Sequence, residues 1–143
     1  MEGFQVDGVQ WALPIDWGAT ALTYNTDEVS AEEASSLYAF ADPKFKGRVS
    51  LIDNVDDAYA LGMLAVGVKD WTKSNDEDFK KASDFLRQVH KNVRQYHADG
   101  AEGAALMKSG EILLEWTWNE LAFTLGWEEN EPPLVFNREN KEG

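Results

Sequence analysis

The chain has 143 residues and a mass of 16.0 kDa, which is the size of one domain that can bury a core of its own. It contains no cysteine, which excludes disulfides, thiol catalysis and zinc–thiolate sites, and no apolar run approaches the roughly 20 residues that cross a membrane. A formal net charge of −13 predicts no nucleic-acid partner and favours cations, although acidity on its own also serves solubility.

The predicted elements alternate between strands and helices, which is typical of an α/β layered domain with a mostly parallel sheet. In chain order they are strands over 9–14 and 19–24, a helix over 30–40, a strand over 48–52, a helix over 53–66, a helix behind residues 74–77, a strand over 93–96, a helix over 101–108, a strand over 112–116, a helix over 118–126 and a strand over 134–136. Capping boxes at 30–33 and 74–77 predict two of the helix starts, and Gly67 predicts a helix end. The helix behind 74–77 carries one apolar face, made of Phe79, Ala82, Phe85, Leu86 and Val89.

Three carboxylates within five residues mark the junction after the strand over 48–52. Asp53, Asp56 and Asp57 lie at a helix start, where acids cap free N–H groups and favour the helix dipole. A cap rarely needs all three, and the side chains of Asp53 and Asp57 are expected to project toward one crevice beyond the strand ends. Such a pair suits an ammonium or guanidinium group. The same pair leaves a small carboxylate-dependent hydrolase open as an alternative.

Two tryptophans mark a second junction, between the strand over 112–116 and the helix after it. Trp116 and Trp118 share one face if the strand runs on to residue 118, because side chains two apart on a strand point the same way. They pack in the core or offer a face to a ligand, and both interpretations stay open here. Asn119 is a candidate helix cap, and Glu120 places a favourable charge in the first turn.

The remaining chemical signals are weak. His90 falls within a predicted helix and His97 just past a strand, and neither has a carboxylate or a second histidine at metal-ligand spacing. No glycine-rich phosphate loop and no Gly-x-Ser-x-Gly elbow occurs. We therefore predict no metal, no cofactor and no enzymatic activity. A structural or partner-binding domain without a small ligand is the other alternative.

A longer stretch carries a family resemblance. Residues 43–53, Pro-Lys-Phe-Lys-Gly-Arg-Val-Ser-Leu-Ile-Asp, resemble a segment of the bacterial extracellular solute-binding proteins of ABC importers, and most closely those of the spermidine/putrescine type. Six further pieces agree and follow one another in the family's order. They are residues 13–20, 24–27, 90–93, 106–111, 118–120 and 141–143.

The resemblance implies a fold and a role. Such proteins have two α/β lobes joined by hinge strands, with the ligand clamped between the lobes. Residues 1–143 would be one α/β lobe of a type II periplasmic binding protein, the continuous second lobe, with its termini at the hinge and the first lobe missing. The implied role is non-catalytic capture for uptake, with the ABC importer membrane subunits as partners of a periplasmic parent protein.

Two expectations concern the ends and the uncovered faces of the lobe. The acidic start Met1-Glu2-Gly3 is not a signal peptide, so this chain carries no address of its own. Without the first lobe, the cleft face and the hinge strands are uncovered, and we expect a homodimer of the isolated lobe.

The resemblance also assigns ligand-binding residues. The family's ligand carboxylate falls on Asp57, and its ligand-stacking tryptophan falls on Trp118. Asn54 stands where the family often has a further acid, so one charged anchor is absent. A polyamine or other cationic amine is the predicted ligand, and amino-acid derivatives and opine-like compounds stay open. The residues predicted to line the cleft are Asp57, Trp118, Asp53, Asn54, Trp17, Asn119 and Glu120.

Overall fold

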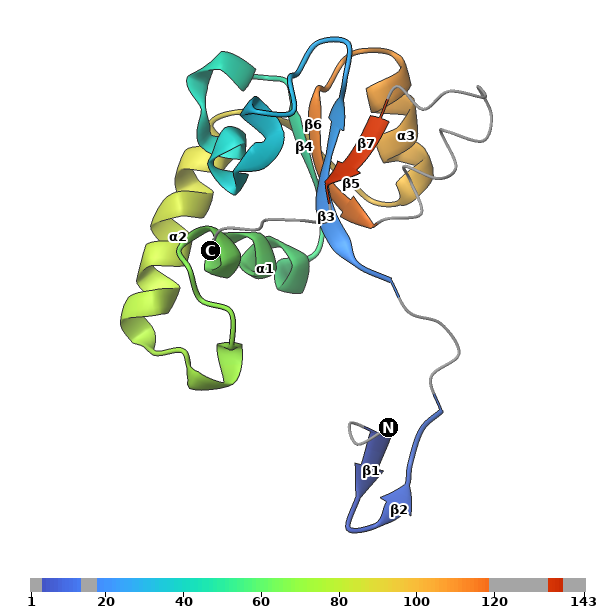
Figure 1. Cartoon of the computed structure of the whole chain (residues 1–143), viewed down its shortest axis with the longest axis vertical. Coiled ribbons are helices and arrows are strands. Elements are labelled where there is room, and N and C mark those ends of the chain that lie inside the picture. The colour runs from blue at the N-terminus through green and yellow to red at the C-terminus, as the bar shows by residue number, and fades with distance from the viewer. Residues whose placement is uncertain (1–3, 14–17, 119–133, 138–143) are drawn as a thin grey trace.

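The computed structural model describes residues 4–13, 18–118 and 134–137, and it shows an N-terminal hairpin apart from an α/β body (Figure 1). Strands β1 (Gln5–Val6) and β2 (Val9–Gln10) pair antiparallel. Asp7 and Gly8 both have positive φ, which is the backbone of a tight two-residue hairpin turn. The strand predicted over 9–14 is therefore only two residues long, because it belongs to a short hairpin.

The body is built around one mixed sheet with the strand order β5-β4-β6-β3-β7. Strand β4 is parallel to β5 and β6, whereas β3 is antiparallel to β6 and β7. The α/β fold class is confirmed. The sheet is mixed, because β3 runs against the other four strands, a reversal that alternation in the sequence does not report. The strands are β3 (Thr20–Asn25), β4 (Val49–Ile52), β5 (Val93–His97), β6 (Leu114–Trp118) and β7 (Leu134–Asn137).

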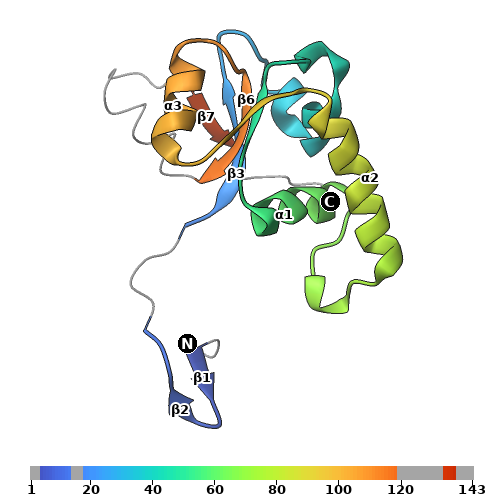
Figure 2. The same ribbon diagram turned by 180° about the vertical axis from the view of Figure 1, so that it is seen from behind.

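Helices cover both faces of this sheet (Figure 2). Helices α1 (Val55–Ala65) and α2 (Asp76–His90) lie on one face, and α3 (Gly100–Lys108) lies on the other. Short 3-10 helices complete the body: η2 (Glu33–Ser35), η3 (Leu37–Ala41), η4 (Pro43–Phe45) and η5 (Trp71–Lys73). No helix within the described ranges is long and apolar enough to span a membrane.

The main core lies between one face of the sheet and the helices α1, α2 and η3 that cover it. Alternate residues of the strands point into it, including Leu22, Leu51 and Trp116, and they meet Leu61 of α1 and Phe85 of α2. On the opposite face the apolar cluster is much smaller and consists of Leu106, Met107 and Ile112, with Ala104 packed against it. The two faces of one sheet therefore differ in how much apolar surface they bury.

The helix predicted over 30–40 is wrong, because the chain forms two 3-10 turns there. The predicted capping box does form: the Ser30 backbone N–H donates to Glu33 Oε2 at 3.0 Å, and the Glu33 N–H donates to Ser30 Oγ at 3.3 Å. Ser36 then adopts an extended backbone, and its side chain caps the next turn by accepting from the Tyr38 N–H. A serine in this role competes with helix continuation, which ends the first turn early.

Two further boundaries and the burial of one residue differ from the prediction. The capping box of α2 joins Asn75 and Asp78, one residue later than expected, because Ser74 instead closes η5 through the Trp71 carbonyl. Phe79, predicted on the apolar face, is 45% exposed and packs only at the edge of the core against Tyr59. Strand β6 runs on to residue 118, so the predicted helix does not begin there, and residues 119–126 lie outside the described ranges.

Candidate functional site

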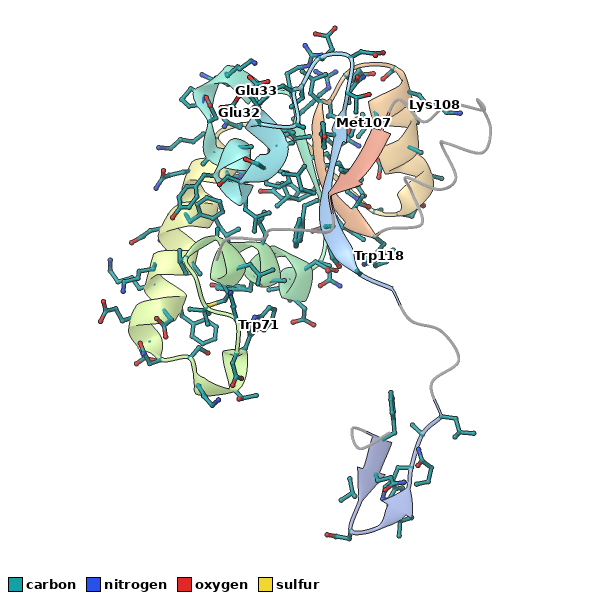
Figure 3. The ribbon with its side chains drawn as sticks, in the orientation of Figure 1. Glu32, Glu33, Trp71, Met107, Lys108 and Trp118 are labelled. Carbon is teal, nitrogen blue, oxygen red and sulfur yellow. The ribbon has the colours of Figure 1, made fainter. Side chains whose placement is uncertain are left out.

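The candidate site forms where β6 ends, β3 begins and α1 starts. Thr20 and Trp118 are directly opposed in the antiparallel β3–β6 ladder. After β4 the chain continues through Asp53 and Asn54 into the first turn of α1, which carries Asp57. Figure 3 shows Trp118 at the end of the sheet where β3 enters the body. Three segments that are distant in sequence therefore converge on one end of the sheet.

Asp57 is held in place by two hydrogen bonds from different strands. The Thr20 hydroxyl donates to Asp57 Oδ1 at 2.6 Å, and the Trp116 indole Nε1–H donates to the Asp57 backbone carbonyl at 2.8 Å. The side chain of Asp57 is half-buried. Residues 4–13, 18–118 and 134–137 supply no hydrogen bond to the second carboxylate oxygen, and Oδ1 keeps a second lone pair beside the Thr20 bond, so the Asp57 carboxylate can accept further hydrogen bonds.

The two tryptophans of β6 have different environments. Trp116 is 3% exposed and meets the ring of Phe40 edge-on with centroids 6.3 Å apart, so core packing is confirmed for it. Trp118 is 40% exposed at the end of the same face. A large aromatic side chain with a free surface next to an oriented carboxylate can stack on the alkyl chain or the charge of a cation.

Asn54 acts as the N-cap of α1. Its side-chain oxygen accepts from the backbone N–H groups of Asp56 at 2.8 Å and of Asp57 at 3.1 Å. This oxygen is committed to the helix, which leaves the amide NH₂ as the group that can face a ligand. The cap also fixes the backbone on which the Asp57 side chain stands.

Asp53 faces a different strand from Asp57. Its backbone N–H donates to the His97 carbonyl at 2.9 Å. Burial raises the pKa of Tyr96 on β5, and the nearby charge of Asp53 raises the pKa further. The contacts of Asp53 thus lie on the β5 side of β4 and those of Asp57 on the β3–β6 side, and no described contact joins the two carboxylates.

Three predicted site residues cannot be placed, and one residue of the site was not predicted. Trp17, Asn119 and Glu120 lie outside the described residues. Thr20 was not predicted, and it is the residue that links Asp57 to the strand opposite Trp118. Its only signal was its place within the segment 13–20 that resembles the family. In the part of the chain that the structure describes, no group of three or more acidic, histidine or cysteine side chains is arranged to hold a metal ion.

Comparison with known proteins supplies the family. The profile described as "Bacterial extracellular solute-binding protein" matches residues 1–134. The chain belongs to this family. Among curated relatives, the spermidine/putrescine-binding periplasmic protein of Escherichia coli K12 is 26% identical over 113 residues, which are 79% of this chain and 32% of that protein. The spermidine/putrescine-binding periplasmic protein 1 of Haemophilus influenzae is 25% identical over 112 residues, which are 78% of this chain and 30% of that protein.

Solved structures of solute-binding proteins show the same fold. The spermidine/putrescine ABC transporter substrate-binding protein PotD of Streptococcus pneumoniae matches with a TM-score of 0.72 and 20% identity, over 89% of this chain and 38% of that chain. The PBP MotA of A. tumefaciens B6, solved in complex with glucopine, matches with a TM-score of 0.67 and 23% identity, over 83% of this chain and 38% of that chain. The chain thus spans about a third of the length of the relatives it matches.

Proposed function

We propose that this chain is the second, ligand-binding lobe of an ABC-importer solute-binding protein that captures a cationic organic amine without converting it. Asp57 is the charged anchor in this proposal, and Trp118 is the stacking surface. The first lobe of the same receptor closes the cleft, and the importer membrane subunits receive the ligand. Curated relatives are named as periplasmic proteins, which supports a periplasmic parent protein.

One observation carries the proposal: the Asp57 carboxylate is oriented by Thr20 on the strand that pairs with Trp118. A carboxylate that is fixed before binding loses little conformational freedom when a ligand arrives. Charge-assisted hydrogen bonds to such a carboxylate contribute roughly 1.5–3 kcal/mol each. The net charge of −13 adds long-range attraction for a cation.

The geometry of Asp57 favours one kind of cation over another. Thr20 already donates to Oδ1, so a ligand that binds both carboxylate oxygens has to share Oδ1 with the Thr20 hydroxyl. An ammonium is a point charge that needs one oxygen, whereas a guanidinium binds best through two parallel hydrogen bonds to both oxygens. We therefore expect alkylammonium ligands to be preferred over guanidinium ligands of the same length. The names of the relatives, spermidine/putrescine-binding proteins, agree with an alkylamine.

The position of Asn54 bears on how many charges the ligand carries. Its oxygen is used as a helix cap, so it supplies no second anion beside Asp57. A ligand with one ammonium near Asp57, such as an amino-acid-derived amine of the opine class, therefore competes with a polyamine for this cleft. The related MotA fold was solved with glucopine.

The test is calorimetric titration of a receptor that pairs this lobe with a first lobe, using putrescine, spermidine, agmatine and an opine. We expect Asp57→Asn and Trp118→Ala each to weaken binding of the best amine by about tenfold or more. Asp56→Asn removes a charge from the same helical turn and is the matched control, as is Trp71→Ala, a comparably exposed tryptophan on η5. Unchanged affinity in both site variants would place the ligand elsewhere, and absence of amine binding in the unaltered receptor would refute the proposed ligand class.

A further inference from the structure

The face of the sheet beneath α3 carries a cluster of buried polar side chains. We call this cluster the α3 seat, and its members are Thr23, Ser50, His97, Glu115 and Thr117. All five side chains are buried, with at most 1% of any of them exposed. Burying so many polar groups beneath one short helix is costly unless they bind something or one another. The α3 seat lies on the opposite face of the sheet from Asp57 and Trp118, and it plays no part in the proposed ligand site.

Glu115 lies at the centre of the seat. It is opposed by Ser50 on β4 and by Thr23 on β3 in the register of the sheet. Helix α3 passes directly over it, because a β-carbon added at Gly103 would overlap Glu115 Oε1. Neither carboxyl oxygen has a hydrogen-bond partner among the described residues. A glycine in the middle of a helix is unfavourable for helix formation, so the contact with Glu115 gives this glycine its structural reason.

His97 is the nearest ionisable neighbour of Glu115. Its Nδ1 lies 3.3 Å from Glu115 Oε1 and 2.9 Å from Ser50 Oγ. The single hydroxyl hydrogen of Ser50 is donated to the Gln95 carbonyl at 2.9 Å. Ser50 Oγ must therefore accept from His97, which assigns the hydrogen of a neutral His97 ring to Nδ1. Nε2 of the same ring is a buried acceptor without a partner among the described residues.

Burial keeps both groups of this pair uncharged near neutral pH. It raises the pKa of the Glu115 carboxyl from 4.5 to about 8. Burial also lowers the pKa of His97 below its ordinary 6.5, although the acidic side chains of Glu102 and Asp99 on α3 act in the opposite direction. At pH 7 the seat therefore holds a protonated carboxyl next to a neutral imidazole.

The other charged groups around the seat are engaged elsewhere. Arg48, which precedes β4, donates to the Gly110 carbonyl at 2.7 Å, and Arg94 on β5 pairs with Glu111 before β6. Glu102 of α3 accepts from the Ala98 backbone N–H at 2.7 Å and from Gln95. Within the described ranges no lysine or arginine forms an ion pair with Glu115. An ionised Glu115 would thus be a buried charge with no lysine or arginine partner in the part of the chain that the structure describes.

Helix α3 has a small apolar contact with the described part of the sheet. Its apolar contact is the small cluster of Leu106, Met107 and Ile112, whereas α1 and α2 share the main core. Elements with few buried apolar contacts open locally at a lower free energy than the global one. When α3 opens, Glu115 meets water and returns to an ordinary carboxyl that is ionised at neutral pH. Opening of α3 is therefore coupled to release of one proton.

We propose that Glu115 and His97 form a proton-binding site that controls the docking of α3, so that the helix is held while the proton is bound and opens increasingly as the pH rises. The pH window follows from the two groups. Between pH 6.5 and 8, Glu115 makes the larger difference in protonation between the two states. An exposed His97 is half-protonated only at the lower end of this window, and the Glu115 of the closed state is half-ionised only at its upper end. The open population therefore rises by about tenfold across the 1.5 units. Below pH 6.5, proton uptake by an exposed His97 opposes the effect of Glu115.

The test is native-state amide hydrogen exchange of the 143-residue chain, corrected for the intrinsic pH dependence of exchange. We expect the amides of α3 to exchange through a local opening, faster than those of α2, with protection about tenfold lower at pH 8 than at pH 6.5. Glu115→Gln keeps the shape and cannot ionise, so it removes this loss of protection. Glu28→Gln, an exposed glutamate in the loop after β3, is the matched control and keeps it.

A second measurement needs no variant. The side-chain carboxyl carbon of Glu115, followed by ¹³C NMR, should titrate near pH 8 in the unaltered chain. Titration near 4.5 would overturn the proposal, as would a common exchange rate for α2 and α3 amides, or the same pH dependence in Glu115→Gln. Each of these outcomes is independent of whether the chain binds an amine.

Discussion

Leu22 and Trp116 line one face of the central sheet, whereas their chain neighbours Thr23 and Glu115 line the other. Two adjacent strands thus present an apolar surface to α1 and α2 and a polar surface to α3. The first surface belongs to the main core, and the second holds the α3 seat. Hydrophobic burial supplies most of the free energy of folding, so the two faces should contribute very differently to stability.

The difference separates two tasks of the same sheet. The apolar face anchors the strands and α1, and through α1 it fixes the backbone of Asp57. The polar face gives α3 a docked state whose free energy depends on a proton. A fully apolar sheet would be more stable on both faces but would carry no titratable group inside. We therefore expect changes on the apolar face to alter the free energy of unfolding most, and changes on the polar face to alter its pH dependence.

The largest effect is expected on the apolar face. Phe40 of η3 is fully buried and packs edge-on against Trp116. Phe40→Ala leaves a cavity between η3 and the sheet, and should lower the free energy of unfolding by about 3–5 kcal/mol. Chemical denaturation followed by tryptophan fluorescence measures this loss. Phe79→Ala, at an exposed position of α2, is the control and should cost much less.

A smaller but sharper effect is expected from the polar face. Gly103→Ala places a methyl group where the Glu115 carboxyl lies, and should lower the free energy of unfolding by about 1–3 kcal/mol. Glu115→Ala removes the obstacle, so the double variant Gly103→Ala/Glu115→Ala should be more stable than the sum of the single effects predicts. Additive effects in this cycle would show that α3 does not rest on Glu115.

The two faces of the sheet also differ in how well the sequence predicts them. The periodicity that indicated the strands and helices was largely sufficient, because it depends on local alternation. The junction after β4 was predicted, and so was the free face of Trp118, because strand-to-helix junctions carry polar side chains in a recognisable order. The convergence of Thr20 with Asp57 depends on the antiparallel pairing of β3 with β6, which no local pattern encodes.

The buried pair was missed for a related reason. The sequence predicts no site at His97, because no acid lies near it at metal-ligand spacing, yet Glu115 faces it from a strand two places across the sheet. Glu115 itself stood inside an apolar run and had no motif of its own. The helix over 30–40 failed differently, since its capping box formed but Ser36 began a new turn. Non-local pairing and competing side-chain caps account for most of what was missed.

The third prediction separates the two faces by pH. Glu115 has a folded-state pKa raised to about 8, so between pH 6.5 and 8 the folded chain keeps a proton that the unfolded chain has released. The contribution of Glu115 to stability therefore falls as the pH rises, by about 1.4 kcal/mol per unit well below pH 8 and by about 1.6 kcal/mol across the whole window. Denaturation of the unaltered chain and of Glu115→Gln at both pH values isolates this term. An equal pH dependence in both proteins would assign it to other groups.

The smallest effect concerns the one place where the apolar face becomes polar. Thr20 lies on the same face of β3 as Leu22 and Tyr24, at the start of the strand. Its hydroxyl donates to the Asp57 carboxylate instead of packing in the core. Thr20→Val keeps the shape and removes one half-buried hydrogen bond, so it should lower the free energy of unfolding by about 1 kcal/mol. Thr20→Ser retains the hydroxyl and should restore most of that loss in the same denaturation measurement. In a two-lobed receptor, Thr20→Val removes the hydroxyl that shares Oδ1 with the ligand. It should narrow the preference for butylamine over butylguanidine, because the guanidinium no longer competes with Thr20 at Oδ1. An unaltered preference together with unaltered stability would mean that the Thr20 hydroxyl does not orient Asp57.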